Sequence, residues 1–325
     1  MGSNALMASA AVGGSSVDLP DLSTQQFFVN SRVGTRGNNG FTIDRPFLTI
    51  QAALDAQTSG RRAVIYLAPG EYREHLDVTK PYTFITGYAG LHPGATRITG
   101  DGATARATVR VLASNNATRG FGLANLFVET GFPETTSLSQ PCIHIETDDL
   151  DDNVTDTDEL GALTPGYHWT LNNVYIVSDG LPTAGLLLEG ANMGRVTDCV
   201  IAGVIHGIVF TNSSVNLPAD IDFYNVRFYN NTTADVTTSS SASTITAGGT
   251  ISTLESVNFY RPFFLDRGGT PVTNYVNMAV TTATNCGFYD FYAARDVADG
   301  TLMELPANVI ALGHSAAGVE SIIGA

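Results

Sequence analysis

The chain has 325 residues, of which 43% are hydrophobic and only 14% are charged, whereas about 25% charged residues is usual in soluble domains. Its 31 acidic residues outnumber 16 basic ones, giving a net charge of −15. A surface of that sign repels phosphate groups and anionic lipids, so we expect no binding to nucleic acid and none to membranes. Three cysteines are too few for a disulfide framework.

Residues 1–25 are small and uncharged apart from two aspartates, with glycine and serine in a row at 13–16. Alone, such a segment buries too little surface to offset its ordering entropy. Two interpretations stay open. The segment is an extended N-terminal arm that a partner protein orders, or it is a tail lying on its own domain.

Residues 26–60 predict one strand and a capping helix. Phe27, Phe28 and Val29 form the strand, and a loop rich in glycine and asparagine follows. Asp44 is expected near the N-cap of the helix and Pro46 in its first turn. Four apolar residues at helical spacing then share one face before Gly60, and they are Phe47, Ile50, Ala53 and Leu54. A helix here would cover the open end of a strand stack.

Residues 61–299 read as short strands with turns between them and no further helix, which excludes an alternating strand–helix sheet. One phrase recurs, a small polar residue followed by apolar positions, and it begins at Asn125, Asn173, Asp198, Asn225, Ser256 and Asn285. The steps are 48, 25, 27, 31 and 29 residues. Four fit one coil of a solenoid, and the first fits either two coils or one coil with an insertion. Roughly eight or nine coils would make a rod ~40 Å long.

The phrase is expected to mark coil corners, where asparagines can stack along the rod. Cys199 and Cys286 follow its polar residue, so we expect both to be small buried core residues. Insertions are cheapest at such corners. We therefore expect any functional surface to lie in the segments outside the repeat. These are the arm 1–25, the loops 131–168 and 232–250, and a C-terminal cap or tail at 300–325.

A familiar order of motifs runs from Phe28 to Gly87. Its central stretches are Pro46–Ala53 (PFLTIQAA) and Val64–Tyr72 (VIYLAPGEY), followed by Glu74. This order resembles the opening of right-handed parallel β-helix proteins of the pectin-lyase-like superfamily. The resemblance implies an all-β fold, a right-handed parallel β-helix with an N-terminal capping helix. The superfamily includes polysaccharide lyases and hydrolases, bacterial surface proteins, and phage tailspikes and virion fibres, so it does not settle function.

Catalysis on such a fold would need carboxylates at equal positions in adjacent coils, and no such ladder is evident in the sequence. The candidate acids are Glu129, Asp148 and Asp179. Tyr167 and Trp169 are candidates for stacking on a sugar, and the six histidines are scattered without a close pair. The acidic stretch 146–159 is expected to be a solvated loop. Its oxygen ligands, Asp151, Asn153, Asp156 and Asp158, are candidates for Ca²⁺, although the spacing is not that of an EF-hand.

These observations favour a phage virion structural protein at the virion surface, a head decoration or short fibre that contacts host surface glycans. We expect a homotrimer, with a capsid or tail protein holding the arm 1–25. One alternative is a tailspike or secreted polysaccharide-degrading enzyme, a lyase or glycoside hydrolase. Another is a microbial surface or adhesion module, with an extracellular location. Whether the chain is an enzyme stays open at this point.

Overall fold

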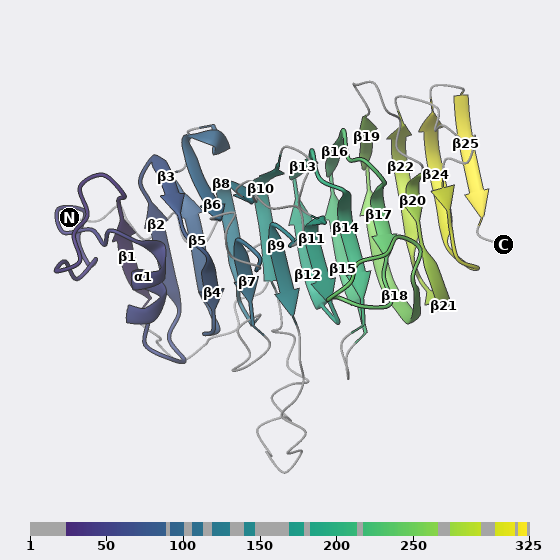
Figure 1. Ribbon diagram of the computed structural model, residues 1–325. Coiled ribbons are helices and arrows are strands. Elements are labelled where there is room, and N and C mark those ends of the chain that lie inside the picture. Colours follow the sequence, from purple (N-terminus) through teal and green to yellow (C-terminus); the bar gives the residue numbers. More distant parts are fainter. Residues whose placement is uncertain are drawn as a thin grey trace, which may run out of the picture.

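The computed structural model describes residues 24–88, 92–100, 106–112, 119–130, 140–146, 169–178, 183–212, 217–265, 274–293, 303–315 and 318–323. These residues form an elongated stack of strands that runs from the N-terminal to the C-terminal end (Figure 1). Among them, no helix is long and apolar enough to cross a membrane. Most of the predicted arm 1–25 lies outside the described residues.

Two sheets wind around one apolar core. The larger sheet contains β1 (Gln25–Val29), β2 (Ala63–Leu67), β3 (Gly70–Arg73), β5 (Thr83–Gly87), β6 (Thr96–Gly100), β8 (Gly122–Thr130), β10 (Trp169–Val177), β12 (Asn192–Thr197), β13 (Val200–Ala202), β15 (Ala219–Tyr224), β16 (Arg227–Tyr229), β18 (Thr250–Tyr260), β19 (Phe263–Leu265), β21 (Ala279–Thr284), β22 (Gly287–Ala293), β24 (Ile310–Ser315) and β25 (Gly318–Ile323). The smaller sheet contains β4 (Leu76–Val78), β7 (Val109–Val111), β9 (Ile143–Glu146), β11 (Ala184–Glu189), β14 (His206–Thr211), β17 (Ala234–Thr238), β20 (Asn274–Asn277) and β23 (Met303–Glu304).

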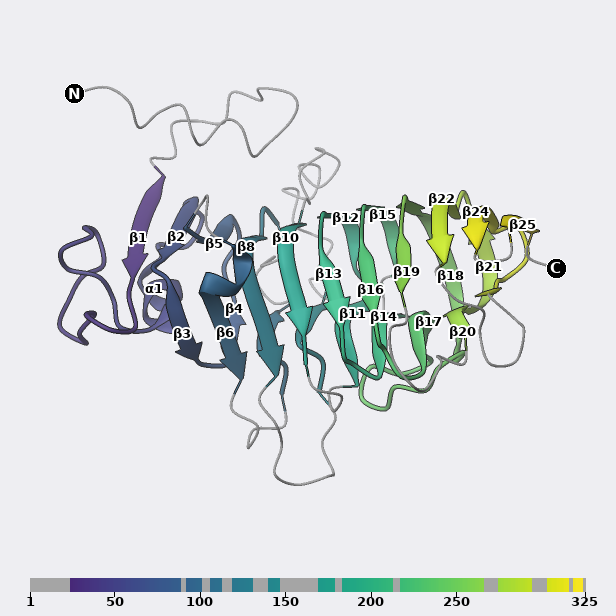
Figure 2. The same cartoon turned by 90° about the horizontal axis from the view of Figure 1, so that it is seen from above.

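Successive coils pair in parallel, so each strand lies beside the equivalent strand of the next coil (Figure 2). The eight strands of the smaller sheet come from eight successive coils, in agreement with the predicted number. Inside, like residues stack on like: Phe223, Phe259 and Phe288 have ring centroids 4.3 and 4.5 Å apart. The predicted parallel β-helix is thereby confirmed, and one layer of its core is a ladder of phenylalanine rings.

The recurring phrase does mark corners, because all six of its polar residues have φ between 51° and 55°. Asparagine tolerates this left-handed backbone better than most residues do. Along the corner, Asn173 donates to Asn125 at 2.9 Å and Asn225 donates to Asp198 at 2.8 Å. Asn173 lies in the coil directly after Asn125, so the step of 48 residues is one coil with an insertion.

The phrase nevertheless follows two corner columns, which corrects the prediction of one. Ser256 is in register with Asp220, between the pairs Ala219–Glu255 and Ile221–Val257, and Asn285 continues that column. Asn225 is in register with Arg261 instead, one place after the Tyr224–Tyr260 pair. The step of 31 residues therefore changes column, and Cys199 and Cys286 do not share one position. All three cysteines are buried as expected.

One α-helix is described, α1 (Ile50–Ala56), together with a 3₁₀ turn η1 (Pro93–Ala95). The helix begins later than predicted. Phe47 forms a parallel bridge with Val29 of β1, so the chain through Asp44 and Pro46 is not helical. Thr49 is the N-cap, and its hydroxyl accepts from the N–H of Ala52. The helix buries Ile50, Ala53 and Leu54 against the core, while its role as a cap stays a prediction.

At the C-terminal end, the chain continues the stack where a cap or tail was expected. β24 pairs in parallel with β22 as a further strand of the larger sheet. β25 then turns back and pairs antiparallel with β24. The remaining domain boundaries stay predictions.

Candidate functional site

The outer face of the smaller sheet carries a row of charged side chains at its N-terminal half. Along each strand, alternate residues point into the apolar core, among them Val109, Ile143 and Leu186. The residues between them point outward. In register, Asp77 of β4 is followed by Arg110 of β7 and by His144 of β9.

Two residues further along the strands, Glu146 of β9 lies in register with Glu189 of β11. This is a carboxylate pair at equal positions in adjacent coils. Both lie beside the charged row, because Glu146 follows His144 by two residues and so points to the same side of the strand. The backbone pairing of β7, β9 and β11 thus brings Arg110, His144 and the two glutamates together.

These four side chains form one continuous group of hydrogen bonds and ionic contacts. Nε and Nη2 of Arg110 both lie 2.7 Å from Oε1 of Glu146. Nδ1 of His144 lies 3.3 Å from the same oxygen, and Nε2 of His144 lies 3.0 Å from Oε2 of Glu189. The imidazole therefore bridges the two carboxylates. His144 and Glu146 are mostly buried, while 28% of the Glu189 side chain is exposed.

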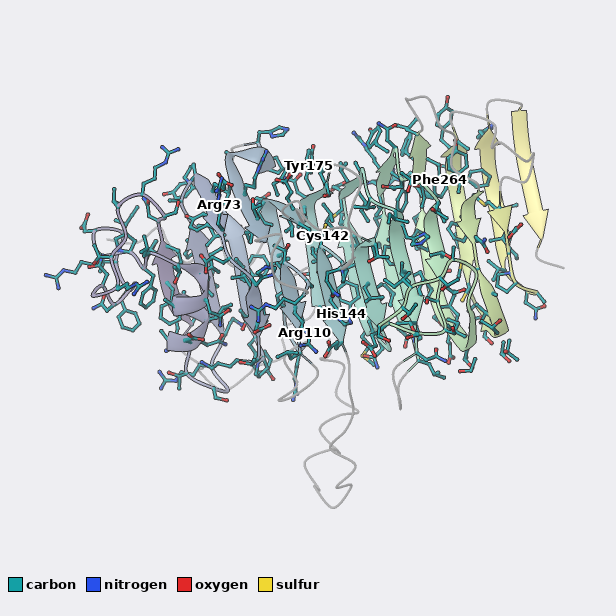
Figure 3. All side chains as sticks on the ribbon, viewed as in Figure 1. Arg73, Arg110, Cys142, His144, Tyr175 and Phe264 are labelled. Atoms are coloured by element: carbon teal, nitrogen blue, oxygen red, sulfur yellow. The ribbon has the colours of Figure 1, made fainter. Side chains whose placement is uncertain are left out.

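A groove of about 570 Å³ opens over this group. Arg106 stands at one side, where it contacts Oδ2 of Asp77 and the carbonyl of His75, each at 3.0 Å. Ala107, Pro141 and Leu187 add apolar surface, and Gln140, Asn212, Ser241 and Ser243 add neutral polar groups. In Figure 3, Arg110 and His144 lie close together on neighbouring strands of this sheet.

The wall with Ser241 and Ser243 belongs to the loop between β17 and β18. Ala242 and Ile245 of this loop pack on Ala184, Leu187 and Val209 of the smaller sheet's outer surface. The hydroxyl of Ser239 fastens it by donating to the carbonyl of Ser241 at 2.8 Å. The stretch 232–250 was predicted as a loop, but its residues Ala234–Thr238 form the buried strand β17, and only the residues after them make one side of the groove.

The group can carry acid–base chemistry on a ligand in the groove, since two carboxyls and an imidazole lie within reach of one another. His144, Glu146 and Glu189 also offer ligand atoms within 4.8 Å of one another. The two ring nitrogens of His144, however, face different carboxylates, and Arg110 already contacts Glu146. The geometry is therefore that of a hydrogen-bonded group more than that of three ligands converging on one cation.

The predicted site residues lie elsewhere. Glu129 is the last residue but one of β8 in the larger sheet and pairs with Arg97 at 3.2 Å, so it does not join the two glutamates. Trp169 has only 1% of its surface exposed, and its Nε1 donates to the carbonyl of Asn192. Its ring is a core residue, which corrects the sugar-stacking prediction. The other predicted residues lie outside the described residues, and they are Asp148, Asp151, Asn153, Asp156, Asp158, Tyr167 and Asp179.

Sequence reasoning missed Arg110, His144, Glu146 and Glu189. The signal was present, because Ile143–Glu146 (IHIE) and Leu186–Glu189 (LLLE) both alternate inward apolar residues and end in glutamate. The insertion between the two strands hid their equivalence, and Glu146 was assigned to the acidic loop that starts there. His206, expected to be a packed strand residue, is buried, and burial lowers its pKa to about 4.

Comparison with known proteins bears on the fold. A pectin methylesterase from Aspergillus niger superposes with a TM-score of 0.54 at 15% identity, covering 90% of this chain and 86% of that one. Escherichia coli YbhC superposes with a TM-score of 0.52 at 14% identity, covering 97% of this chain and 80% of that one. No family model matches the chain, and no curated protein matches it.

The chain thus has a right-handed parallel β-helix fold, like these solved structures. At these identities the likeness shows the fold alone. The expected resemblance to phage virion proteins stays a prediction.

Proposed function

We propose that this chain is a carbohydrate-active hydrolase that cleaves a polysaccharide lying in the groove of the smaller sheet. The observation that carries the proposal is the in-register pair Glu146 and Glu189, bridged by His144 under an open groove. The similar solved structure is named as a pectin methylesterase, which makes a polysaccharide the substrate class to test first.

The chemistry that fits is hydrolysis of a glycosidic bond by two carboxyl groups. Carboxyls about 5–5.5 Å apart are typical of retaining glycosidases, and oxygens of this pair lie within 4.8 Å of each other. Glu189, the more exposed, would protonate the leaving oxygen. Glu146, oriented by Arg110, would attack the anomeric carbon and form a glycosyl ester. Water would then cleave the ester while Glu189 takes up its proton.

The test is the release of reducing ends from a panel of plant and bacterial polysaccharides. We expect Glu146→Gln and Glu189→Gln each to lower the rate at least about a hundredfold, the usual contribution of a positioned acid or base. Glu255→Gln, which changes an exposed glutamate of β18 in the larger sheet, is the matched control and should retain full activity.

The stereochemistry of the first product provides a second check, since two displacements predict retention at the anomeric carbon. Release of methanol from a methyl-esterified substrate, without new reducing ends, would rule out the glycosidic mechanism. Full activity in both Glu146→Gln and Glu189→Gln would rule out this assignment of the site.

A second candidate is a role without cleavage, as a virion or cell-surface protein that only holds a host glycan in this groove. It is favoured by the pairing of each charged group: Glu146 and Glu189 both have cationic or imidazole partners, as is typical of a stable binding site. Binding of a polysaccharide by the wild-type chain, with no turnover and unchanged affinity in Glu189→Gln, would support it.

A further inference from the structure

The outer face of the larger sheet between its two corner columns, here called the lateral face, runs the length of the rod. Ten parallel strands contribute to it, from β1 and β2 through β5, β8, β10, β12, β15, β18 and β22 to β24, and the antiparallel β25 follows β24. Each strand presents two outward residues. One row lies beside the corner column that contains Asn125 and Asn225. In this row, Phe28 and Tyr66 come first, and Tyr224, Tyr260, Tyr289 and Leu312 come last.

This face is almost without charge. Of its outward residues on these ten described strands, only Arg195 and Asp222 are charged, and they lie in register on neighbouring strands with opposite signs. The chain as a whole has a net charge of −15. Two copies of so acidic a chain repel each other over most of their surface, so a neutral face is where they can meet.

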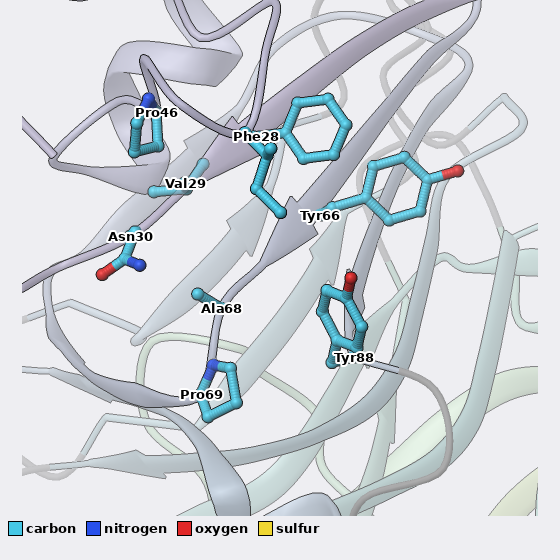
Figure 4. A pocket seen from close by; sticks show the side chains of 9 residues that line it. Phe28, Val29, Asn30, Pro46, Tyr66, Ala68, Pro69 and Tyr88 are labelled. Atoms are coloured by element: carbon cyan, nitrogen blue, oxygen red, sulfur yellow. The ribbon is translucent and has the colours of Figure 1, made fainter. Parts of the chain in front are cut away.

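The two ends of the lateral face have opposite shapes. Its N-terminal end is an apolar pocket of about 310 Å³, where Phe28 and Tyr66 stand beside Tyr88, Pro46 and Pro69 (Figure 4). Near its C-terminal end, β24 projects aliphatic side chains, and 45% of the surface of Leu312 and 40% of that of Ile310 is exposed. A contiguous apolar patch marks an interaction site more than single exposed side chains do.

The middle of the face repeats this complementarity. Small residues, Thr86 and Ala124, lie next after the pocket and are buried below their neighbours. On the other half, at the same distance from the far end, Tyr224 and Tyr260 stack with centroids 4.8 Å apart and stand higher. A bulky half and a shallow half thus lie at mirrored places along one row.

We propose that the lateral face binds a second copy of this chain, antiparallel, about a two-fold axis across the middle of the rod. Leu312 of each copy then enters the pocket of the other. Tyr224 and Tyr260 lie over Ala124 and Thr86. A two-fold axis satisfies both ends at once, as in the isologous interface that most homodimers use. With parallel copies, the N-terminal ends of the two faces would meet each other, and so would their C-terminal ends.

The size of the face fits this occupant. Nine strand spacings of ~4.8 Å give a length of about 43 Å. A width of about 15 Å then yields roughly 600 Å² per copy, near the ~800 Å² per partner of standard interfaces. A polysaccharide fits less well, because Tyr224, Tyr260 and Tyr289 turn their ring faces to one another with interplanar angles of 11° and 18°. A sugar ring would need a free aromatic ring face on which to stack.

The first experiment measures mass by light scattering and sedimentation over a wide range of concentrations. We expect the full chain to be a dimer. Leu312→Glu should be monomeric with unchanged circular dichroism. Phe263→Glu should remain dimeric, because it adds the same charge at an exposed apolar residue of the larger sheet outside the lateral face.

The second experiment tests the orientation with a short thiol cross-linker. Gln26 and Ile310 are exposed at opposite ends of the second row of the lateral face, and the three native cysteines are buried. An antiparallel pair predicts cross-links only when Gln26→Cys and Ile310→Cys chains are mixed. A cross-link in Gln26→Cys alone, a monomeric wild-type chain, the trimer expected from the sequence, or loss of association in Phe263→Glu but not in Leu312→Glu would each overturn the proposal.

Discussion

Residue identity decides how the coils fit where an insertion interrupts them. Trp169 is the first residue of β10. Its indole ring lies against Gly194 of β12, its register partner in the next coil. A Cβ at position 194 would overlap the indole atoms Cζ2 and Cε2. The glycine is therefore what allows a tryptophan into this layer of the core.

We expect Gly194→Ala to lower the free energy of unfolding by about 1–3 kcal/mol, the usual cost of overpacking a core. Denaturant unfolding followed by tryptophan fluorescence measures it, because Trp169 is the single tryptophan. Gly37→Ala is the matched control, since an added Cβ there has no atom within 4 Å. Equal stability of the Gly194→Ala and wild-type chains would show that the coils can separate to admit a methyl group.

At the scale of elements, the motif that carries the resemblance has a physical reason. Glu74 follows β3 and accepts hydrogen bonds from the N–H groups of Ile50 and Gln51 at 2.8 and 3.0 Å. Tyr72 is buried, and its hydroxyl lies 2.8 Å from the carbonyl of Ala68. Glu74 therefore joins the start of α1 to the first coil, while Tyr72 holds the turn that precedes β3.

Glu74 also predicts a pH dependence. Burial raises its pKa, and the two backbone hydrogen bonds offset part of that rise. A carboxyl whose pKa is higher in the folded state contributes most stability below its unfolded pKa and loses that contribution as pH rises through the folded value.

The free energy of unfolding of the wild-type chain relative to Glu74→Gln should therefore fall as pH rises from below the ordinary glutamate range. Denaturant titrations of both proteins across that range give the difference, in which the titrations of other groups cancel. A difference that grows with pH would mean that the hydrogen bonds outweigh burial.

On the scale of the whole molecule, the acidic surface and the neutral lateral face together set how copies associate. The proposed interface carries a single pair of opposite charges per copy, Arg195 and Asp222. Salt screens charged contacts and leaves apolar burial largely unaffected. Because salt screens the repulsion between the two acidic copies, we expect the dimer dissociation constant to fall between low and physiological salt. Sedimentation at several salt concentrations measures it, and a dimer that weakens as salt rises would indicate attraction between charged faces.

The sequence alone determined the repeating architecture of this protein. The alternation of apolar residues and the left-handed corners are local properties, so the phrase at Asn125, Asn173, Asp198 and Asn225 could be recognised without coordinates. Only the tertiary structure decided the register. Insertions of different length separate equivalent residues along the chain. Ser256 therefore lies in the second corner column, and Glu146 is in register with Glu189, 43 residues further on. Coils pair through backbone hydrogen bonds, which are the same for nearly every residue type. The residues that meet in the site and on the lateral face are therefore known only from the folded structure.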